Sequence, residues 1–376
     1  MEQNIFHCSG DYPAIDSWIE NHQIKKILLV CGSSVKRLHI DEYFSLLPQR
    51  KGVQVTRFSD FTPNPDYGSV VKGVELYRSA GFDAIAAVGG GSAIDVAKCI
   101  KLFADMDPDR NYLEQTIIPN RIPFLVMPTT AGTGSEATRF AVIYYNGVKQ
   151  SVNDLSCIPD TVIFDSSVLE TLPLYQKKAT MLDAFCHAIE SFWSVNSTAE
   201  SKTFSREAIR LILSNAEPYL LNVPDGNEKM LLASNIAGKA INITQTTAGH
   251  AMCYKITGLF GAAHGHAAAL CCRVLFPHMI GNTDNCIDPR GKAYLDQTLY
   301  EIGEAMNCGS PQEAAEQFAA FFAKLELSVP EATEEQFSDL TASVNPLRLK
   351  NHPVLLDEKT INQLYHQILQ EKSHER

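Results

Sequence analysis

One aspartate and three histidines in the second half of the sequence have the residue types and spacing of a metal site. Asp183 and His187 are four residues apart, so a helix would place both side chains on one face. His250 and His264 follow, with glycines between them, and this spacing fits either one long helix or two short helices meeting at a bend. One carboxylate and three imidazoles suit a divalent transition metal such as iron or zinc. We therefore predict a metal site here, although a single histidine in such a stretch is more often only hydrogen-bonded.

A short glycine loop in the first half has the composition of an anion-binding site. The stretch 83–88, which is apolar after Asp83, is typical of a buried strand, and Gly89, Gly90, Gly91 and Ser92 follow it before a helical stretch. Glycines let the backbone approach a phosphate, and the free N–H groups at the start of a helix favour an anion. The loop is neither the Gly-x-Gly-x-x-Gly fingerprint nor a Walker loop. Alone it indicates an anion at a helix N-terminus, and a glycine-rich turn without a ligand is the alternative.

A second loop of small residues follows the apolar run 122–127. It contains Thr129, Thr130 and Thr133 together with two glycines. Because ligands of open α/β sheets bind at the carboxyl ends of strands, we expect both loops to lie at one edge of a sheet. A loop with only a structural role remains the alternative.

The apolar pattern predicts two domains. Strand-length apolar runs alternate with helical stretches in the first half, which predicts an α/β domain with a mostly parallel sheet over residues 1–172. Helical periodicity then dominates, which predicts an all-helical metal and substrate domain over 173–376. The predicted strands are 4–8, 26–31, 53–58, 83–88, 122–127 and 161–165, with a hairpin over 138–152. The predicted helices of the second half are about 175–194, 200–221, 227–248, 250–257, 264–280, 291–306, 310–325, 333–342 and 357–371.

Composition excludes several classes of protein. The net charge of -11 argues against non-specific binding to nucleic acid or to an anionic membrane. No stretch reaches the ~18 uninterrupted apolar residues of a membrane span. The ten cysteines form no Cys-x-x-Cys pair and indicate buried thiols in a reducing compartment. The first residues lack a basic segment followed by a long apolar run, so we expect a cytoplasmic protein with no nucleic-acid or membrane partner.

Together these motifs resemble the iron-containing (group III metal-dependent) alcohol dehydrogenase family. The resemblance is carried by residues 89–98, 128–136 and 183–190 and by His250 with His264, and it covers nearly the whole chain. It implies a dinucleotide-binding α/β domain, a helical metal domain and NAD or NADP as the hydride carrier. It also implies iron, with zinc as the alternative, held by Asp183, His187, His250 and His264. The cofactor-binding positions that it implies are Gly89, Gly90, Gly91, Ser92, Asp95, Thr129, Thr130, Thr133 and Lys149.

The residues after the second predicted strand depart from many NAD-using members of that family. Those members carry an aspartate there, where it binds ribose hydroxyls and repels a 2′-phosphate. This chain has Gly32, followed by Ser33, Ser34 and Lys36, which is similar to the arrangement in NADPH-using members. Without the carboxylate, and with hydroxyl donors and a cation, the site favours a phosphate. We therefore predict NADP(H), with NAD(H) as the alternative.

A second departure concerns the proton. Many members carry another histidine four residues after the third metal ligand, and this chain has Tyr254. With a reference pKa near ~10, a tyrosine is a weaker base at neutral pH. The predicted catalytic residues are therefore His264, as a metal ligand, and Tyr254, as a candidate proton relay. His266 is close in sequence, but two residues after His264 it points away on a helix, so packing is its expected role.

A narrower resemblance is to the phosphonoacetaldehyde reductase branch of the family, which makes 2-hydroxyethylphosphonate. It is carried by residues 249–269, 137–142 and 147–151. A phosphonate requires charge-assisted donors, and Arg139 and Lys255 are cations beside the site motifs. We predict that they bind the substrate, although both also fit ordinary surface charges.

The predicted function is thus metal-dependent, NAD(P)H-linked reduction of a small aldehyde to a primary alcohol, by a homodimer that acts in phosphonate metabolism. The favoured substrate is phosphonoacetaldehyde. A general short-chain alcohol, diol or lactaldehyde dehydrogenase of the same family is the main alternative. A dehydroquinate synthase-like lyase would need a glutamate among its metal ligands. A non-catalytic binding protein would not need four metal ligands together with a cofactor loop.

Overall fold

The computed structural model describes residues 3–371, and they divide into two compact units. The first unit contains the chain up to Leu172 together with Leu221–Leu231, and the second contains Pro173–Leu220 and the chain from Leu232. The predicted ranges 1–172 and 173–376 place Leu221–Leu231 in the second domain, whereas the structure places this segment in the first unit. Two contacts tie this segment to the first unit: Asn227 donates a hydrogen bond to the Ser166 carbonyl at 3.3 Å, and a carboxylate oxygen of Glu228 lies 3.0 Å from Nδ1 of His7.

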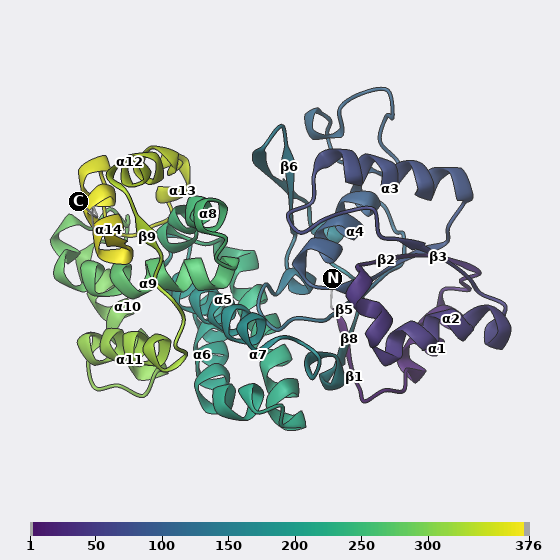
Figure 1. The fold of residues 1–376 in the computed structure, drawn as a ribbon, viewed down its shortest axis with the longest axis horizontal. Coiled ribbons are helices and arrows are strands. Elements are labelled where there is room, and N and C mark those ends of the chain that lie inside the picture. The colour runs from purple at the N-terminus through teal and green to yellow at the C-terminus, as the bar shows by residue number, and fades with distance from the viewer. Residues whose placement is uncertain (1–2, 372–376) are drawn as a thin grey trace, which may run out of the picture. The chain divides into compact units, whose positions relative to one another are not determined.

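The first unit is built on a six-stranded sheet in which every pairing is parallel (Figure 1). The predicted α/β fold with a mostly parallel sheet is therefore confirmed. The strand order is β1-β8-β5-β4-β2-β3. The strands are β1 (Asn4–Cys8), β2 (Lys26–Cys31), β3 (Gln54–Phe58), β4 (Ala84–Gly89), β5 (Phe124–Pro128) and β8 (Thr161–Asp165).

The central strands are buried along their whole length, which is why they read as unbroken apolar runs. Every residue of β4, β5 and β8 is buried. The helices of this unit are α1 (Pro13–Asn21), α2 (His39–Lys51), α3 (Tyr67–Ala80) and α4 (Gly91–Phe103). Helices α3 and α4 approach closely at Gly73, where a Cβ would lie 2.4 Å from Cδ1 of Ile100.

The predicted hairpin is present as β6 (Phe140–Tyr145) and β7 (Val148–Asn153), which pair antiparallel. Its turn residues Asn146 and Gly147 have φ angles of 51° and 74°. Two successive positive φ angles belong to the type I′ turn, whose twist matches that of the flanking strands.

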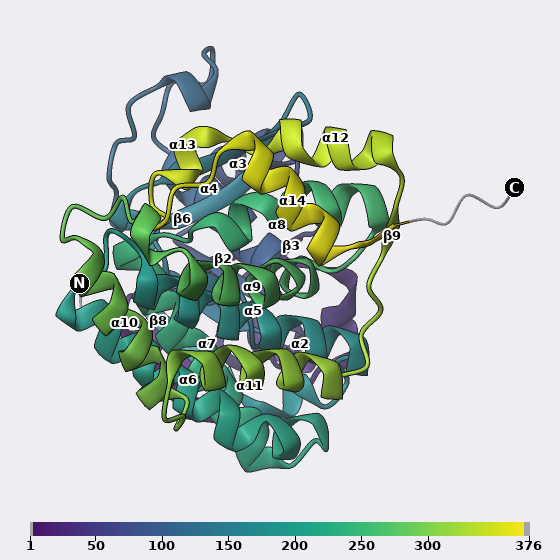
Figure 2. The same ribbon diagram turned by 90° about the vertical axis from the view of Figure 1, so that its left-hand side faces the viewer.

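The second unit is helical, as predicted. Helices α5 and α9 pack side by side in it, as do α8 and α9 (Figure 2). Helix α13 and the two-residue strands β9 (Glu331–Ala332) and β10 (Gln370–Glu371) of this unit were not predicted. A segment of two to four residues is too short to show a periodic pattern. The helices are α5 (Leu174–Trp193), α6 (Ala199–Leu220), α7 (Pro224–Thr244, which starts in the first unit), α8 (Ala248–Phe260), α9 (His264–Gly281), α10 (Lys292–Ala305), α11 (Pro311–Lys324), α12 (Glu334–Ser343), α13 (Pro346–Leu349) and α14 (Glu358–Ile368).

Side-chain caps fix where several of these helices begin. Ser310, Thr333 and Asp357 each accept a hydrogen bond from a backbone N–H in the first turn of α11, α12 and α14. At α12 the side chain of Gln336 also accepts from the Thr333 backbone, which completes a capping box. These bonds satisfy N–H groups that have no partner within the helix.

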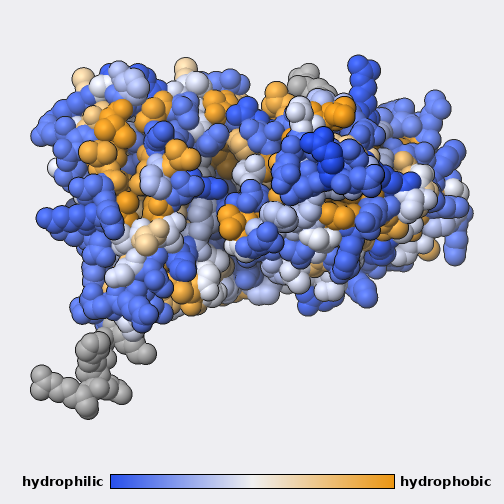
Figure 3. Space-filling model, turned by 90° about the horizontal axis from the view of Figure 1, so that it is seen from above, coloured by the Kyte–Doolittle hydropathy of each residue, from blue (hydrophilic) through white to orange (hydrophobic). Residues whose placement is uncertain are grey.

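The helices within residues 3–371 include none that is long and apolar enough to cross a membrane. The face seen in Figure 3 is largely hydrophilic, with smaller groups of apolar side chains between. All ten cysteines are free thiols, and seven of them are buried, as expected. Cys8, Cys286 and Cys308 are only half-buried.

Candidate active site

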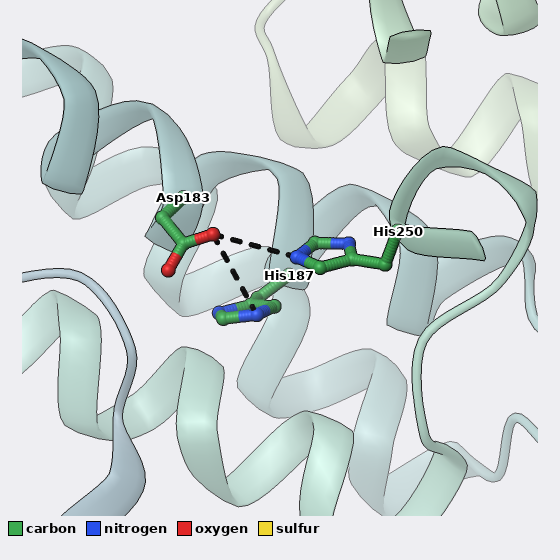
Figure 4. A group of neighbouring side chains, drawn as sticks. All are labelled: Asp183, His187 and His250. Carbon is green, nitrogen blue, oxygen red and sulfur yellow. Dashed lines mark hydrogen bonds and ion pairs between the residues drawn. The ribbon is translucent and has the colours of Figure 1, made fainter. Parts of the chain in front are cut away.

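Three of the four predicted metal ligands converge in the helical unit. Asp183 and His187 lie one turn apart on α5, and His250 comes from α8 (Figure 4). One donor atom from each lies within 4.8 Å of the other two, and all three residues are buried. From Oδ1 of Asp183 the distance is 3.4 Å to Nε2 of His250 and 3.9 Å to Nε2 of His187. One carboxylate and two imidazoles thus face a common point.

His264 lies next to this group rather than within it. It is the first residue of α9, and its ring centroid is 5.2 Å from that of His250. Helix α8 ends at Phe260, and the next residue, Gly261, has a φ of 68° that turns the chain before α9 begins. The bend between two short helices is therefore the arrangement observed, and it brings His264 beside His250.

Two glycines permit the close helix contacts that form this site. A Cβ at Gly265 would lie 2.1 Å from the Ala179 carbonyl and 2.5 Å from Cβ of Asp183, so α9 can approach α5 only without a side chain there. A Cβ at Gly249 would lie 2.5 Å from Sγ of Cys272 and 2.9 Å from a carboxylate oxygen of Glu190. Each glycine adjoins a histidine of the site in sequence.

Glu190 is a site residue that the sequence analysis did not single out. Its carboxylate bonds Nδ1 of His250 and also accepts from the backbone N–H and the hydroxyl of Thr247 at 3.0 and 2.6 Å. An ionised carboxylate only accepts, so Nδ1 of His250 carries the hydrogen and Nε2 faces Asp183. The available signal was an acidic residue seven positions after Asp183, two turns along the same helix in an apolar stretch.

The electrostatics of this group favour a cation. Burial alone would raise the pKa of Asp183, but His187, with His250 and His264, holds it below its usual range. Burial likewise opposes ionisation of Glu190, yet His250 lowers the pKa of that carboxyl to about 2. Burial would lower the pKa of His250, whereas Glu190 and Asp183 raise it to about 9. Two ionised carboxylates around buried imidazoles fit a divalent transition metal, because its charge would offset theirs.

In the first unit, the predicted cofactor loops lie where the strand order reverses. β2 pairs with β3 on one side and with β4 on the other, so the chain runs outward to β3 and then returns past β2. The loops that begin at Gly32 and Gly90 follow these two adjacent strands. Such a reversal is the usual ligand site of an open parallel sheet.

The two small-residue loops after β4 and β5 are in contact. Thr129 donates a backbone hydrogen bond to the Gly89 carbonyl at 3.0 Å. A Cβ at Gly90 would lie 3.2 Å from Oγ1 of Thr130, and a Cβ at Gly91 would lie 3.0 Å from Cγ2 of Thr133. The glycines therefore serve the packing of one loop on the other, besides opening the start of α4.

Asp95 and Lys98 hold the second loop in place. The Asp95 carboxylate accepts from the Ser135 hydroxyl at 2.7 Å and from the Val142 backbone at 3.0 Å, and burial raises its pKa. Nζ of Lys98 donates to the carbonyls of Ser135 and Thr138 at 2.5 and 2.7 Å. Both Asp95 oxygens are thus engaged within the protein, which indicates that this residue supports the loop.

The remaining predicted cofactor residues lie around these loops. The hydroxyl of Ser92 accepts a hydrogen bond from the Asn64 backbone at 3.3 Å. Lys149 lies on β7 opposite Tyr144, and its charge acts on Asp95. The side chains of Ser33, Ser34 and Lys36 are exposed on the short 3-10 helix Ser33–Arg37 that follows β2.

Tyr254 is positioned between His264 and an arginine that the sequence analysis missed. It follows His250 by one turn of α8, and its ring stacks on that of His264 with centroids 5.4 Å apart and an interplanar angle of 16°. Its hydroxyl accepts a hydrogen bond from Nη1 of Arg348 at 3.1 Å. Arg348 lies 94 residues further along the chain, so no local spacing connects the two.

The other predicted residues are less closely tied to the metal ligands. Lys255 is half-buried beside Tyr254 in sequence. Arg139 belongs to the first unit, where its guanidinium carbon lies 5.2 Å from the centroid of the Phe140 ring. His266 bonds the Tyr175 hydroxyl at 3.2 Å and lies against Phe322, which is the packing role expected for it.

The chain is similar to some proteins that are much longer than it is and to others of comparable length. The chain is 30% identical over 325 residues to aldehyde-alcohol dehydrogenase 2 of Entamoeba histolytica, which covers 80% of this chain and 37% of that protein. It therefore spans little more than a third of that relative's length. It is 29% identical over 321 residues to the phosphonoacetaldehyde reductase of Streptomyces viridochromogenes, covering 81% of this chain and 80% of that protein.

A solved structure and two protein-family models also match this chain. A solved structure of 1,3-propanediol oxidoreductase superposes with a TM-score of 0.85 at 25% identity, covering 97% of this chain and 98% of that one. Residues 3–166 match the model of the iron-containing alcohol dehydrogenases, and residues 177–369 match the C-terminal model of the Fe-containing alcohol dehydrogenase family. This chain belongs to the iron-containing alcohol dehydrogenase family.

Proposed function

We propose that the protein catalyses the NAD(P)H-linked reduction of a small aldehyde to a primary alcohol at a divalent metal, with iron favoured over zinc. The observation that carries this proposal is the buried convergence of Asp183, His187 and His250, backed by Glu190. Membership of the iron-containing alcohol dehydrogenase family supports both the metal and the hydride chemistry.

The residues that would hold the metal are Asp183, His187, His250 and His264. A metal bound there acts as a Lewis acid on a carbonyl oxygen. Glu190 fixes the tautomer and orientation of His250, because its carboxylate accepts from Nδ1. The three converging ligands are buried, and electrostatic interactions are stronger away from water.

The glycine loops would hold the nicotinamide cofactor. The N–H groups at the start of α4, in Gly91 and Ser92, offer donors to a phosphate at the point where the strand order reverses. Ser33, Ser34 and Lys36 are exposed after β2 and would bind a 2′-phosphate, which favours NADP(H) over NAD(H). Thr129, Thr130, Thr133 and Lys149 would line the same site.

Tyr254 would handle the proton. Its hydroxyl accepts a hydrogen bond from Arg348, and a phenol hydroxyl that accepts in this way also carries a hydrogen that it can donate. Its ring stacks on His264, which keeps the hydroxyl at a fixed distance from that ligand. We therefore propose that the Tyr254 hydroxyl donates the proton that the alkoxide product receives, directly or through water.

Phosphonoacetaldehyde is the substrate that we favour. The reductase of that name in Streptomyces viridochromogenes is similar over four-fifths of both chains. Arg139 and Lys255 would then contribute charge-assisted hydrogen bonds to the phosphonate. A short-chain alcohol or diol dehydrogenase is the second candidate, favoured by the structural match to 1,3-propanediol oxidoreductase. A lyase has no such support, since Glu190 bonds the far nitrogen of His250 and does not join the converging donors.

An assay of coenzyme oxidation tests this proposal. The iron-loaded protein would be given NADPH or NADH with phosphonoacetaldehyde, propionaldehyde, lactaldehyde or 3-hydroxypropionaldehyde. We expect turnover with several aldehydes and the highest kcat/KM with phosphonoacetaldehyde and NADPH. A metal-loaded protein that oxidises neither coenzyme with any of the aldehydes would contradict the proposed function.

A further inference from the structure

Arg348 lies beside Tyr254 in the helical unit. It lies on α13, which packs against α8 (Figure 1). Its Nη1 donates to the Tyr254 hydroxyl at 3.1 Å, and its guanidinium carbon lies 5.1 Å from the centroid of the Tyr254 ring. The same ring stacks on His264. One aromatic ring therefore separates the guanidinium from the histidine next to the converging metal ligands.

Within residues 3–371 the charge of Arg348 has no ion-pair partner, and the Tyr254 hydroxyl is the one hydrogen-bond acceptor of its side chain. The side chain is half-buried, so part of the guanidinium is withdrawn from water. An arginine carries five N–H donors in a planar fork that matches the oxygens of a phosphonate or carboxylate. Most of these donors remain open to an anion.

We propose that Arg348, held in place by Tyr254, binds the anionic end of the substrate while the carbonyl lies at the metal. This inference rests on the proposed function and narrows it to short aldehydes that carry an anionic group, of which phosphonoacetaldehyde is the favoured one. The Tyr254 hydroxyl fixes one edge of the guanidinium and leaves the other edge for paired charge-assisted hydrogen bonds. Arg348 thereby sets the preference for anionic over neutral aldehydes. Lys255 and Arg139 are secondary candidates for binding the same anionic group.

The substitution Arg348→Met tests this directly, since it keeps an unbranched apolar side chain against Tyr254 and removes the charge. The quantity measured is the ratio of kcat/KM for phosphonoacetaldehyde to kcat/KM for propionaldehyde, which is similar in length and neutral. We expect the ratio to fall at least about 10-fold, mostly through KM of the anionic aldehyde. Arg348→Lys, which retains charge without the planar fork, should fall between wild type and Arg348→Met.

Lys350→Gln is the matched control, because Lys350 is an exposed cation two residues further along the same segment. Its ratio should stay within about 2-fold of the wild-type value, as expected for a surface charge. If Arg348→Met lowers kcat/KM for both aldehydes equally, Arg348 acts only by supporting Tyr254, and the proposal is wrong. The proposal would also be overturned if Lys350→Gln decreased the ratio by as much as Arg348→Met does.

A binding measurement separates this inference from the proposed function. Calorimetric titration of the zinc-loaded protein with 2-hydroxyethylphosphonate requires no turnover. We expect Arg348→Met to weaken this binding at least about 10-fold and Lys350→Gln to leave it unchanged. If no aldehyde is reduced but this difference is found, the anion site stands and the reductase function falls. Equal binding by wild type and Arg348→Met overturns the anion site, whatever the aldehyde assay shows.

Discussion

At the scale of single residues, Glu190 is the carboxylate on which the geometry of His250 depends. Replacing Glu190 by Gln keeps a hydrogen-bond acceptor but removes the negative charge that acts on His250. We expect the metal affinity to fall about 10- to 100-fold, as for other carboxylates that support a ligating histidine. Competition with a chelator of known affinity measures this without any turnover.

The control for this variant is Glu316→Gln, which removes an exposed carboxylate from α11. It should bind metal as the wild type does. Unchanged metal affinity in Glu190→Gln would show that the bond between Glu190 and His250 has no part in holding the metal.

His352 predicts a pH dependence of stability that is separate from the metal ligands. It is fully buried, it lies edge-on to Trp193, and neither ring nitrogen has a hydrogen-bond partner within residues 3–371. Burial lowers its pKa from 6.5 to about 3. The unfolded chain therefore binds a proton here at a higher pH than the folded one, so stability is fully present above 6.5 and falls as the pH drops towards 3.

The corresponding experiment compares urea unfolding of the metal-free protein at pH 6.5 and pH 5.0. His352 should account for a loss of about 2 kcal/mol in the free energy of unfolding over this range. His352→Leu should remove that loss, whereas His39→Gln, which changes an exposed histidine, should retain it. An equal loss in the wild type and in His352→Leu would mean that His352 is not buried in its neutral form.

Some of the predicted site residues have a local pattern, and others were implied only by the resemblance to a family. Asp183 and His187 are one helical turn apart, and a turn of helix is visible in a sequence. Glu190 and Arg348 were missed for different reasons. A buried glutamate on a helix resembles any acidic residue until its partner is known, and Arg348 reaches Tyr254 only through the packing of α13 on α8.

At the scale of elements, the contact between α5 and α9 depends on Gly265. Any side chain there would collide with the Ala179 carbonyl, which is backbone and cannot rotate away. We expect Gly265→Ala to lower the free energy of unfolding by about 1–3 kcal/mol, the usual cost of overpacking. It should also weaken metal binding, because α9 carries His264.

Gly258→Ala is the matched control, since Gly258 is a helical glycine on α8 whose Cβ would meet nothing within 4 Å. It should be neutral or stabilising by up to about 1 kcal/mol, because alanine favours helix more than glycine does. Urea unfolding of both variants measures the difference. Equal stability of the two would show that α9 can move away from α5 at little cost.

Most elements were predictable because their burial is regular. Strands buried on both faces read as apolar runs, and β2 and β8 were predicted with their observed bounds. Asn146 and Gly147 predicted the turn between β6 and β7, because few residue pairs adopt two positive φ angles. Helix α13 has only four residues and no such pattern, although it carries Arg348.

At the scale of the whole molecule, the periodicity of the apolar residues predicted the change from strands to helices after Pro173. The exchange of Leu221–Leu231 into the first unit was not predictable, because it depends on individual contacts such as Asn227 with Ser166. The assembly into a homodimer stays a prediction. It concerns a surface that neither the periodicity nor the described contacts of one chain identify.

The most direct test of the central claim is metal reconstitution of the whole enzyme. The protein is stripped with a chelator and titrated with Fe²⁺ without oxygen, while bound metal and aldehyde-dependent oxidation of NADPH are measured together. We predict one metal per chain and activity that rises in proportion to it, with both lost in His264→Ala and Asp183→Asn. Full turnover by the stripped protein, or by a His264→Ala variant that holds no metal, would contradict the account.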